Sequence, residues 1–225
     1  MLLLFRLLSN VPLRVLHAVG ALLGWAVYLL SPTWRRRFHE NVEQAGYAFA
    51  EVRPAVGHIG RMVGELPRLW LGSPVPASWD NVESLDEAYA RGRGVLLLTP
   101  HLGCFEVTAQ AIAARQLALH GPLTVLYRPA RKPWLAPLVA ASRQRPGLAA
   151  VPTTLAGVRQ MIKALRQGQG VGLLPDQVPP EGMGLWAPFF GKPAYTMTLA
   201  GRLALQTGCE VRLVWGGRLP GGRGL

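Results

Sequence analysis

The sequence contains few acidic residues and few cysteines. Twelve Asp and Glu face 24 Lys and Arg, so the formal net charge is +12, while half of all residues are apolar. Such a charge attracts anionic partners, namely nucleic acid, anionic lipid headgroups or an acidic carrier protein. The apolar content excludes a disordered chain and favours a membrane-associated globular protein. Cys104 and Cys209 form neither a disulfide framework nor a C-x-x-C metal pair, which fits a reducing compartment.

Sequence motifs that are typical of nucleotide binding, serine hydrolases and zinc binding are also missing. The sequence has no G-x-G-x-x-G, no Walker loop, no G-x-S-x-G and no zinc pattern, so the motif evidence gives no support to dinucleotide, nucleotide, serine-hydrolase or zinc chemistry. Four histidines, His17, His39, His58 and His120, have no partners at metal-ligand spacing, and we expect them to be structural. We therefore expect no bound metal and no cofactor.

The N-terminal 30 residues carry no acid. Within them, residues 15–30 form an apolar stretch of 16 residues without Arg or Lys. A straight span needs about 20 residues, so a short span and a helix lying in the interface both remain open. A cleaved signal peptide is disfavoured by the lack of an A-x-A site and by the basic run 35–37. A buried helix of a soluble protein is a further alternative. We expect a membrane anchor with the rest of the chain in the cytoplasm.

The remaining chain alternates strands and helices. We expect an anchor helix over 1–31, a helical segment over 32–80 with two helices in residues 33–71, and an α/β domain over 81–225. Apolar runs predict strands at 94–99, 123–127, 170–174 and 211–215, with helices at 104–118, about 133–144, 155–167 and 197–207. This alternation indicates an α/β fold with a mainly parallel sheet flanked by helices.

Polar side chains follow three of these strands. His101 follows the first strand, Arg128 the second, and Asp176 with Gln177 the third. Ligands of open α/β sheets bind beyond the carboxyl ends of the strands. From residue 91 onward the chain has only four acids, Glu106, Asp176, Glu181 and Glu210. We therefore expect His101, Glu106, Arg128 and Asp176 to converge on one site.

The spacing of His101 and Glu106 carries its own prediction. On one continuous helix the two would lie about 140° apart and could not meet. If Gly103 forms a turn and the helix begins near Cys104, Glu106 lies in the first helical turn, where the helix dipole favours its charge. Its carboxylate could then hold Nδ1–H of His101 and leave Nε2 free to accept a proton. The alternative is a capping glutamate beside an unrelated histidine, because an H-x-x-x-x-E match alone is weak.

Cys104 and the basic stretch that follows Glu106 can also be interpreted from the sequence. Cys104 is expected to be a small thiol packed under the turn, since no base lies at a spacing that would activate it. Between Val107 and Pro175 there are nine basic residues and no acid, which favours an anion site that includes Arg128 and Arg131. Aromatic residues are sparse in this stretch, so it does not resemble a groove for single-stranded nucleic acid.

Four segments, TPHLGCFE, LYRPARKPWL, LLPDQVPPEGMGLWAPFFGKPAYTMT and VRLVWGGRLPGGRG, together resemble the bacterial lipid A lauroyl and myristoyl acyltransferases. These are lysophospholipid-acyltransferase-like enzymes, and the resemblance covers essentially the whole chain. It implies an inner-membrane enzyme that acts on the cytoplasmic face and takes acyl groups from acyl carrier protein to a lipid A precursor, without a cofactor. It also implies site roles for five residues: His101 and Glu106 as the catalytic dyad, and Arg128, Asp176 and Gln177 as substrate-binding residues. Arg131 is added as a substrate-binding residue because it belongs to the basic stretch that favours an anion site.

The sequence departs from the family pattern in two places. Members often have Asn-Trp where this chain has Cys104 and Phe105, and the chain ends at GGRGL where relatives continue, so we expect a C-terminally truncated member. One alternative is an acyltransferase of the same fold that acts on another glycolipid or glycerophospholipid. Another is a non-enzymatic basic protein that binds anionic lipid or nucleic acid.

Overall fold

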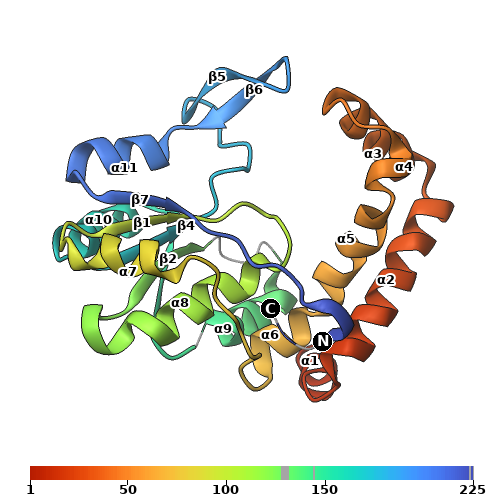
Figure 1. Ribbon diagram of the computed structural model, residues 1–225, viewed down its shortest axis with the longest axis horizontal. Coiled ribbons are helices and arrows are strands. Elements are labelled where there is room, and N and C mark those ends of the chain that lie inside the picture. Colours follow the sequence, from red (N-terminus) through yellow and green to blue (C-terminus); the bar gives the residue numbers. More distant parts are fainter. Residues whose placement is uncertain (128–131, 144, 223, 225) are drawn as a thin grey trace.

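The computed structural model describes residues 1–127, 132–143, 145–222 and 224. Its centre is a five-stranded sheet in which all neighbouring strands are parallel, in the order β3-β2-β4-β1-β7 (Figure 1). The strands are β1 (Val95–Leu98), β2 (Leu123–Tyr127), β3 (Leu148–Pro152), β4 (Gly170–Leu173) and β7 (Glu210–Leu213). The predicted α/β fold with a mainly parallel sheet is confirmed, and β3 is a strand that we did not predict.

Strand β1 lies between β4 and β7. The register pairs Leu98 with Leu173 of β4, and the ladder continues one step further, because Thr99 N donates to Leu173 O at 3.0 Å. Parallel strands end at the same edge of a sheet, so the segments that follow β1 and β4 leave the sheet side by side. This adjacency brings residue 101 next to residue 176.

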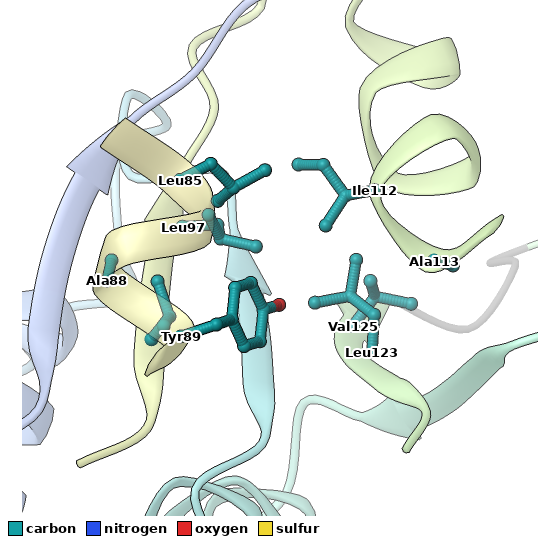
Figure 2. Packing of buried hydrophobic residues seen from close by; sticks show 9 residues of the cluster. Leu85, Ala88, Tyr89, Leu97, Ile112, Ala113, Leu123 and Val125 are labelled. Carbon is teal, nitrogen blue, oxygen red and sulfur yellow. The ribbon is translucent and has the colours of Figure 1, made fainter. Parts of the chain in front are cut away.

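Helices cover both faces of the sheet. On one face, α7 (Val82–Ala90) and α8 (Phe105–His120) pack on β1 and β2 (Figure 2). On the other face, α10 (Leu155–Arg166) and α11 (Leu199–Thr207) pack on β1, β3 and β4. Strand β1 shows the alternation that this requires, since Val95 and Leu97 belong to the first cluster and Leu96 to the second. Side chains of a strand point alternately to the two faces, which explains why the run is apolar throughout.

The N-terminal part consists of helices. These are α1 (Leu2–Leu8), α2 (Leu13–Leu30), α3 (Pro32–Gln44), α4 (Phe49–Val52), α5 (Pro54–Gly64) and α6 (Leu66–Leu71). The prediction of only two helices in residues 33–71 was wrong. Pro54 is the first residue of α5 and Pro67 is the second residue of α6. Proline is suited to the first helical turn, because these positions need no backbone N–H and match its fixed φ. The predicted helix at 133–144 is a short 3₁₀ turn, η1 (Pro133–Leu135), followed by α9 (Ala136–Arg143).

Helix α2 packs closely along α5 (Figure 1). A Cβ atom on Gly60 would lie 1.9 Å from the carbonyl oxygen of Gly20, so glycine is required at this crossing. Among the residues described, α2 is the one helix that is long and apolar enough to cross a membrane, by length and composition. One side of it is buried, and the other exposes large apolar side chains, including Leu22 and Leu23.

A second, two-stranded sheet projects from the domain between β4 and α11 (Figure 1). It is an antiparallel hairpin of β5 (Gly184–Phe189) and β6 (Lys192–Met197), which the sequence pattern did not predict. Phe190 and Gly191 both have positive φ and form its two-residue turn, as the favoured hairpin turns require.

Candidate active site

The turn between β1 and α8 carries the first candidate residue, His101. Strand β1 ends at Leu98 and α8 begins at Phe105. Gly103 has φ +60, and a Cβ atom there would lie 2.2 Å from the carbonyl oxygen of Gly216. The predicted turn at Gly103 is therefore confirmed. Glu106 lies in the first turn of α8, also as predicted.

His101 is held by Asp176, which follows β4. The ring Nδ1 lies 2.8 Å from Oδ1 of Asp176, and the backbone N–H of His101 donates to Oδ2 at 2.7 Å. We had predicted Glu106 as the partner of Nδ1, and this detail was wrong. The reason is the pairing of β1 with β4, which places a carboxylate that is distant in sequence directly beside the turn.

These contacts indicate which tautomer the neutral imidazole adopts. A carboxylate only accepts hydrogen bonds, so the hydrogen between the two groups belongs to Nδ1 of His101. The lone pair is then on Nε2, which lies 3.2 Å from the side-chain nitrogen of Gln177, a donor. A neutral histidine oriented by a carboxylate through Nδ1 and presenting Nε2 has the arrangement of a general base.

The contacts with His101 lower the pKa of the Asp176 carboxyl group. Partial burial acts to raise its pKa, but hydrogen bonds from the backbone and ring of His101 outweigh burial, and the pKa is lowered from its ordinary 3.8. Asp176 is therefore an anion throughout the neutral range. The two side chains are about one third exposed, at 31% for His101 and 37% for Asp176, so a substrate can reach them.

We expect the carboxyl carbon of Asp176 to titrate with a midpoint below 3.8 in ¹³C NMR. Because the folded pKa is the lower one, the stabilising contribution of this carboxylate is complete above about pH 3.8 and disappears as the pH falls through the folded value. In His101→Ala the midpoint should rise toward 3.8, since the ring hydrogen bond is lost while the backbone one remains. A wild-type midpoint at or above 3.8 would contradict the pairing.

The other predicted residues can be placed as follows. Gln177 lies beside His101 at the same edge of the sheet. The ring of Phe105 packs against the imidazole, with a centroid distance of 4.7 Å. Arg128 and Arg131 lie outside the described residues. Within the described part of the chain, no group of three or more His, Cys, Asp or Glu is arranged to hold a metal ion.

Cys104 is buried behind the turn, with 1% of its surface exposed. Burial, followed by the nearby charge of Glu65, raises the pKa of its thiol far above the ordinary value. The thiolate is the reactive form of cysteine, so this environment makes a poor nucleophile. The predicted packing of Cys104 under the turn is confirmed.

Iodoacetamide should therefore modify the partly exposed Cys209 in the native protein and leave Cys104 unmodified. Peptide mass spectrometry measures both sites in one sample, and denaturation should make both reactive. Equal native labelling of the two cysteines would show that Cys104 is accessible and ionisable, against the structure.

Comparison with known proteins identifies one family. No curated protein matches the chain. The family model of the bacterial lipid A biosynthesis acyltransferases matches residues 1–215, which include the anchor-like helix α2, the His101 turn and the segment of Asp176. The chain therefore belongs to the bacterial lipid A biosynthesis acyltransferase family.

Proposed function

We propose that this acyltransferase moves a fatty acyl chain from acyl carrier protein to a hydroxyl group of a lipid A precursor. The observation that carries the proposal is the His101–Asp176 pair at the carboxyl edge of the sheet, formed through Nδ1 of His101. Nε2 of His101 is the proposed proton acceptor. Family membership supports the reaction class and the lipid A pathway. The carrier protein and the precise acceptor belong to the proposal.

In the proposed reaction, Nε2 of His101 takes the proton of the acceptor hydroxyl while the oxygen attacks the thioester carbonyl. Asp176 stabilises the imidazolium that forms, through the hydrogen bond from Nδ1. The tetrahedral intermediate then collapses, the C–S bond breaks, and the thiolate recovers the proton from Nε2. The products are an ester and a free thiol, and no covalent enzyme intermediate is needed.

The remaining site residues receive supporting roles. Backbone N–H groups at the start of α8, or an arginine, are the proposed donors to the oxyanion. Gln177 donates toward Nε2 in the structure, and we propose that its amide orients the acceptor hydroxyl. Glu106 is proposed as a second catalytic carboxylate beside the histidine. Arg128 and Arg131 are proposed to bind phosphate or other anionic groups of the substrates.

We also propose that residues 1–31 bind the inner membrane from the cytoplasmic side. Helix α2 exposes Leu22 (70%), Leu23 (60%) and Leu30 (82%), whereas His17 and Leu16 on its other side are buried. The exposed side chains can enter lipid while the buried ones hold the helix to the rest of the protein.

Changing Leu22, Leu23 and Leu30 together to serine should release the protein from vesicles of phosphatidylethanolamine and phosphatidylglycerol. The fold should survive, because all three side chains are exposed. Flotation of the vesicles measures binding, and circular dichroism measures folding. Undiminished flotation at high salt, which screens the basic surface, would refute α2 as the anchor.

The donor and acceptor are tested in one assay with detergent-solubilised protein. Acyl carrier protein thioester, acyl-coenzyme A and free fatty acid are offered as donors, with a lipid A precursor or a lysophospholipid as acceptor. We expect transfer from the carrier thioester to the lipid A precursor. Preference for the lysophospholipid would favour the alternative acceptor, and absence of transfer from every donor would favour a non-enzymatic lipid binder.

A further inference from the structure

A buried charge cluster lies directly behind the His101 turn. Its centre is Glu65, between α5 and α6, with 1% of its surface exposed. Arg218, which follows β7, binds both carboxylate oxygens, with Nε at 2.8 Å and Nη2 at 2.6 Å. His17 of α2 approaches the same carboxylate, with Nε2 at 2.8 Å. Three segments that are far apart in the sequence therefore meet at one carboxylate.

The same arginine also contacts the turn. Nη2 of Arg218 donates to the carbonyl oxygen of Gly103 at 2.7 Å. One residue further, the backbone N–H of Cys104 donates to the carbonyl oxygen of Gly216 at 2.7 Å. The segment 216–218 thus holds the turn at two adjacent backbone groups, the carbonyl of Gly103 and the N–H of Cys104. Figure 1 shows this C-terminal segment passing from β7 to the lower end of α2.

Glu65 is ionised, and the side chains of the cluster are almost inaccessible to solvent. Burial acts to raise the pKa of Glu65, but hydrogen bonds from His17 and Arg218 outweigh it and the pKa is lowered. The side chain of Arg218 is 6% exposed and that of His17 is 8% exposed. A buried ion pair adds little net stability compared with apolar side chains of similar size. Its directional hydrogen bonds do fix the relative positions of the groups that they join.

We propose that Arg218 is a positioning residue for catalysis. Glu65, whose carboxylate also contacts His17, holds the guanidinium of Arg218 so that the turn presents His101 to Asp176. This inference rests on the proposed role of His101 as general base. Arg218 touches the carbonyl of Gly103, two residues after His101, and not the reacting atoms. Through His17 the same cluster joins the apolar helix α2 to the catalytic turn.

Arg218→Lys tests the inference, because lysine keeps the charge but cannot form the forked contact with both Glu65 and Gly103. Misplacement of a catalytic group by about 1 Å can lower a rate by about 10²-fold. We expect kcat to fall about 10-fold to 100-fold while KM for both substrates stays close to that of the wild type. Arg212→Lys is the matched control, since Arg212 also pairs with a glutamate, Glu210, but within β7. It should retain kcat.

Glu65→Gln provides a second variant of nearly unchanged volume, in which Arg218 loses its charged partner. It should show the same loss of kcat as Arg218→Lys. Lower thermal stability is expected for either variant under any role, so thermal stability is not diagnostic and kcat is compared per folded molecule. Wild-type kcat in both variants, measured on protein that circular dichroism shows to be folded, would overturn the proposal.

A readout without turnover separates this inference from the proposed function. In ¹⁵N-histidine-labelled protein, the Nδ1–H proton of His101, assigned by its loss in His101→Ala, reports the hydrogen bond to Asp176. Arg218→Lys should shift or broaden this resonance, and Arg212→Lys should leave it unchanged. An unchanged resonance in Arg218→Lys would contradict positioning even if the enzyme were active, and a shifted one would support positioning even if the substrate assignment were wrong.

Discussion

Replacing His101 by alanine should lower the rate of acyl transfer by about 10²–10⁴-fold, the usual effect of removing a general base. Asp176→Asn should have an effect of similar size, although its side chain has nearly the same shape. An asparagine amide that donates to Nδ1 places the remaining hydrogen on Nε2, and the imidazole then lacks the lone pair that accepts the substrate proton. The measurement is kcat/KM with carrier thioester and lipid A precursor.

Two exposed residues serve as controls for these variants. His58→Ala and Asp80→Asn make the same chemical changes at exposed positions and should retain activity. Circular dichroism should show all four proteins to be folded. Wild-type turnover in His101→Ala would refute the proposed mechanism. If Asp176→Asn kept wild-type turnover and Glu106→Gln lost most of its turnover, Glu106 and not Asp176 would be the carboxylate that orients His101.

Gly103→Ala should also lower the activity strongly, because it displaces the backbone of the turn that carries His101. The new Cβ would lie 2.2 Å from the carbonyl oxygen of Gly216, a backbone atom that cannot rotate away. The positive φ adds about 1–2 kcal/mol of strain. Because the turn must then shift, His101 leaves Asp176, and we expect a loss of about 10²-fold in kcat.

Gly92→Ala is the matched control for this substitution. Gly92 also has a positive φ, +68, but a Cβ atom there would meet nothing within 4 Å. Both variants should lose the stability that corresponds to the φ strain, while Gly103→Ala should lose activity as well. Thermal unfolding and kcat separate the two effects. Equal activity of the two variants would show that the Gly103 turn tolerates displacement.

The sheet and the position of the site were predictable because apolar runs and polar strand ends are local signals. His101 and Asp176 each follow an apolar strand, and parallel strands end at a common edge. Which carboxylate would hold Nδ1 was not predictable. Glu106 is five residues from His101 and was favoured by proximity in sequence, whereas Asp176 reaches the ring only because β4 is the neighbour of β1.

The missed strands lack the usual composition of strands. Strand β3 has the sequence LAAVP, with one β-branched residue, so its identity comes from pairing with β2 rather than from propensity. The hairpin carries Pro188 and Pro193, which argue against a strand. They are opposite each other in a two-stranded ribbon, where each strand is an edge and a missing N–H is tolerated.

The Glu65 cluster illustrates a further limit of sequence reasoning. His17 and Arg218 are separated by most of the chain, and no periodicity connects them with Glu65. Only the packing of α2 along α5, and of the C-terminal segment along α2, brings these three side chains together. A buried charge needs such partners, but the sequence does not reveal which residues they are.

The central claim is most directly tested by mass spectrometry of lipid A from cells that lack their own late acyltransferases and express this chain. We predict a new lipid A species heavier by one fatty acyl group, present with the wild-type chain and absent with His101→Ala expressed at the same level in the same membranes. An unchanged lipid A spectrum, with the folded wild-type protein in the membrane fraction, would contradict the account.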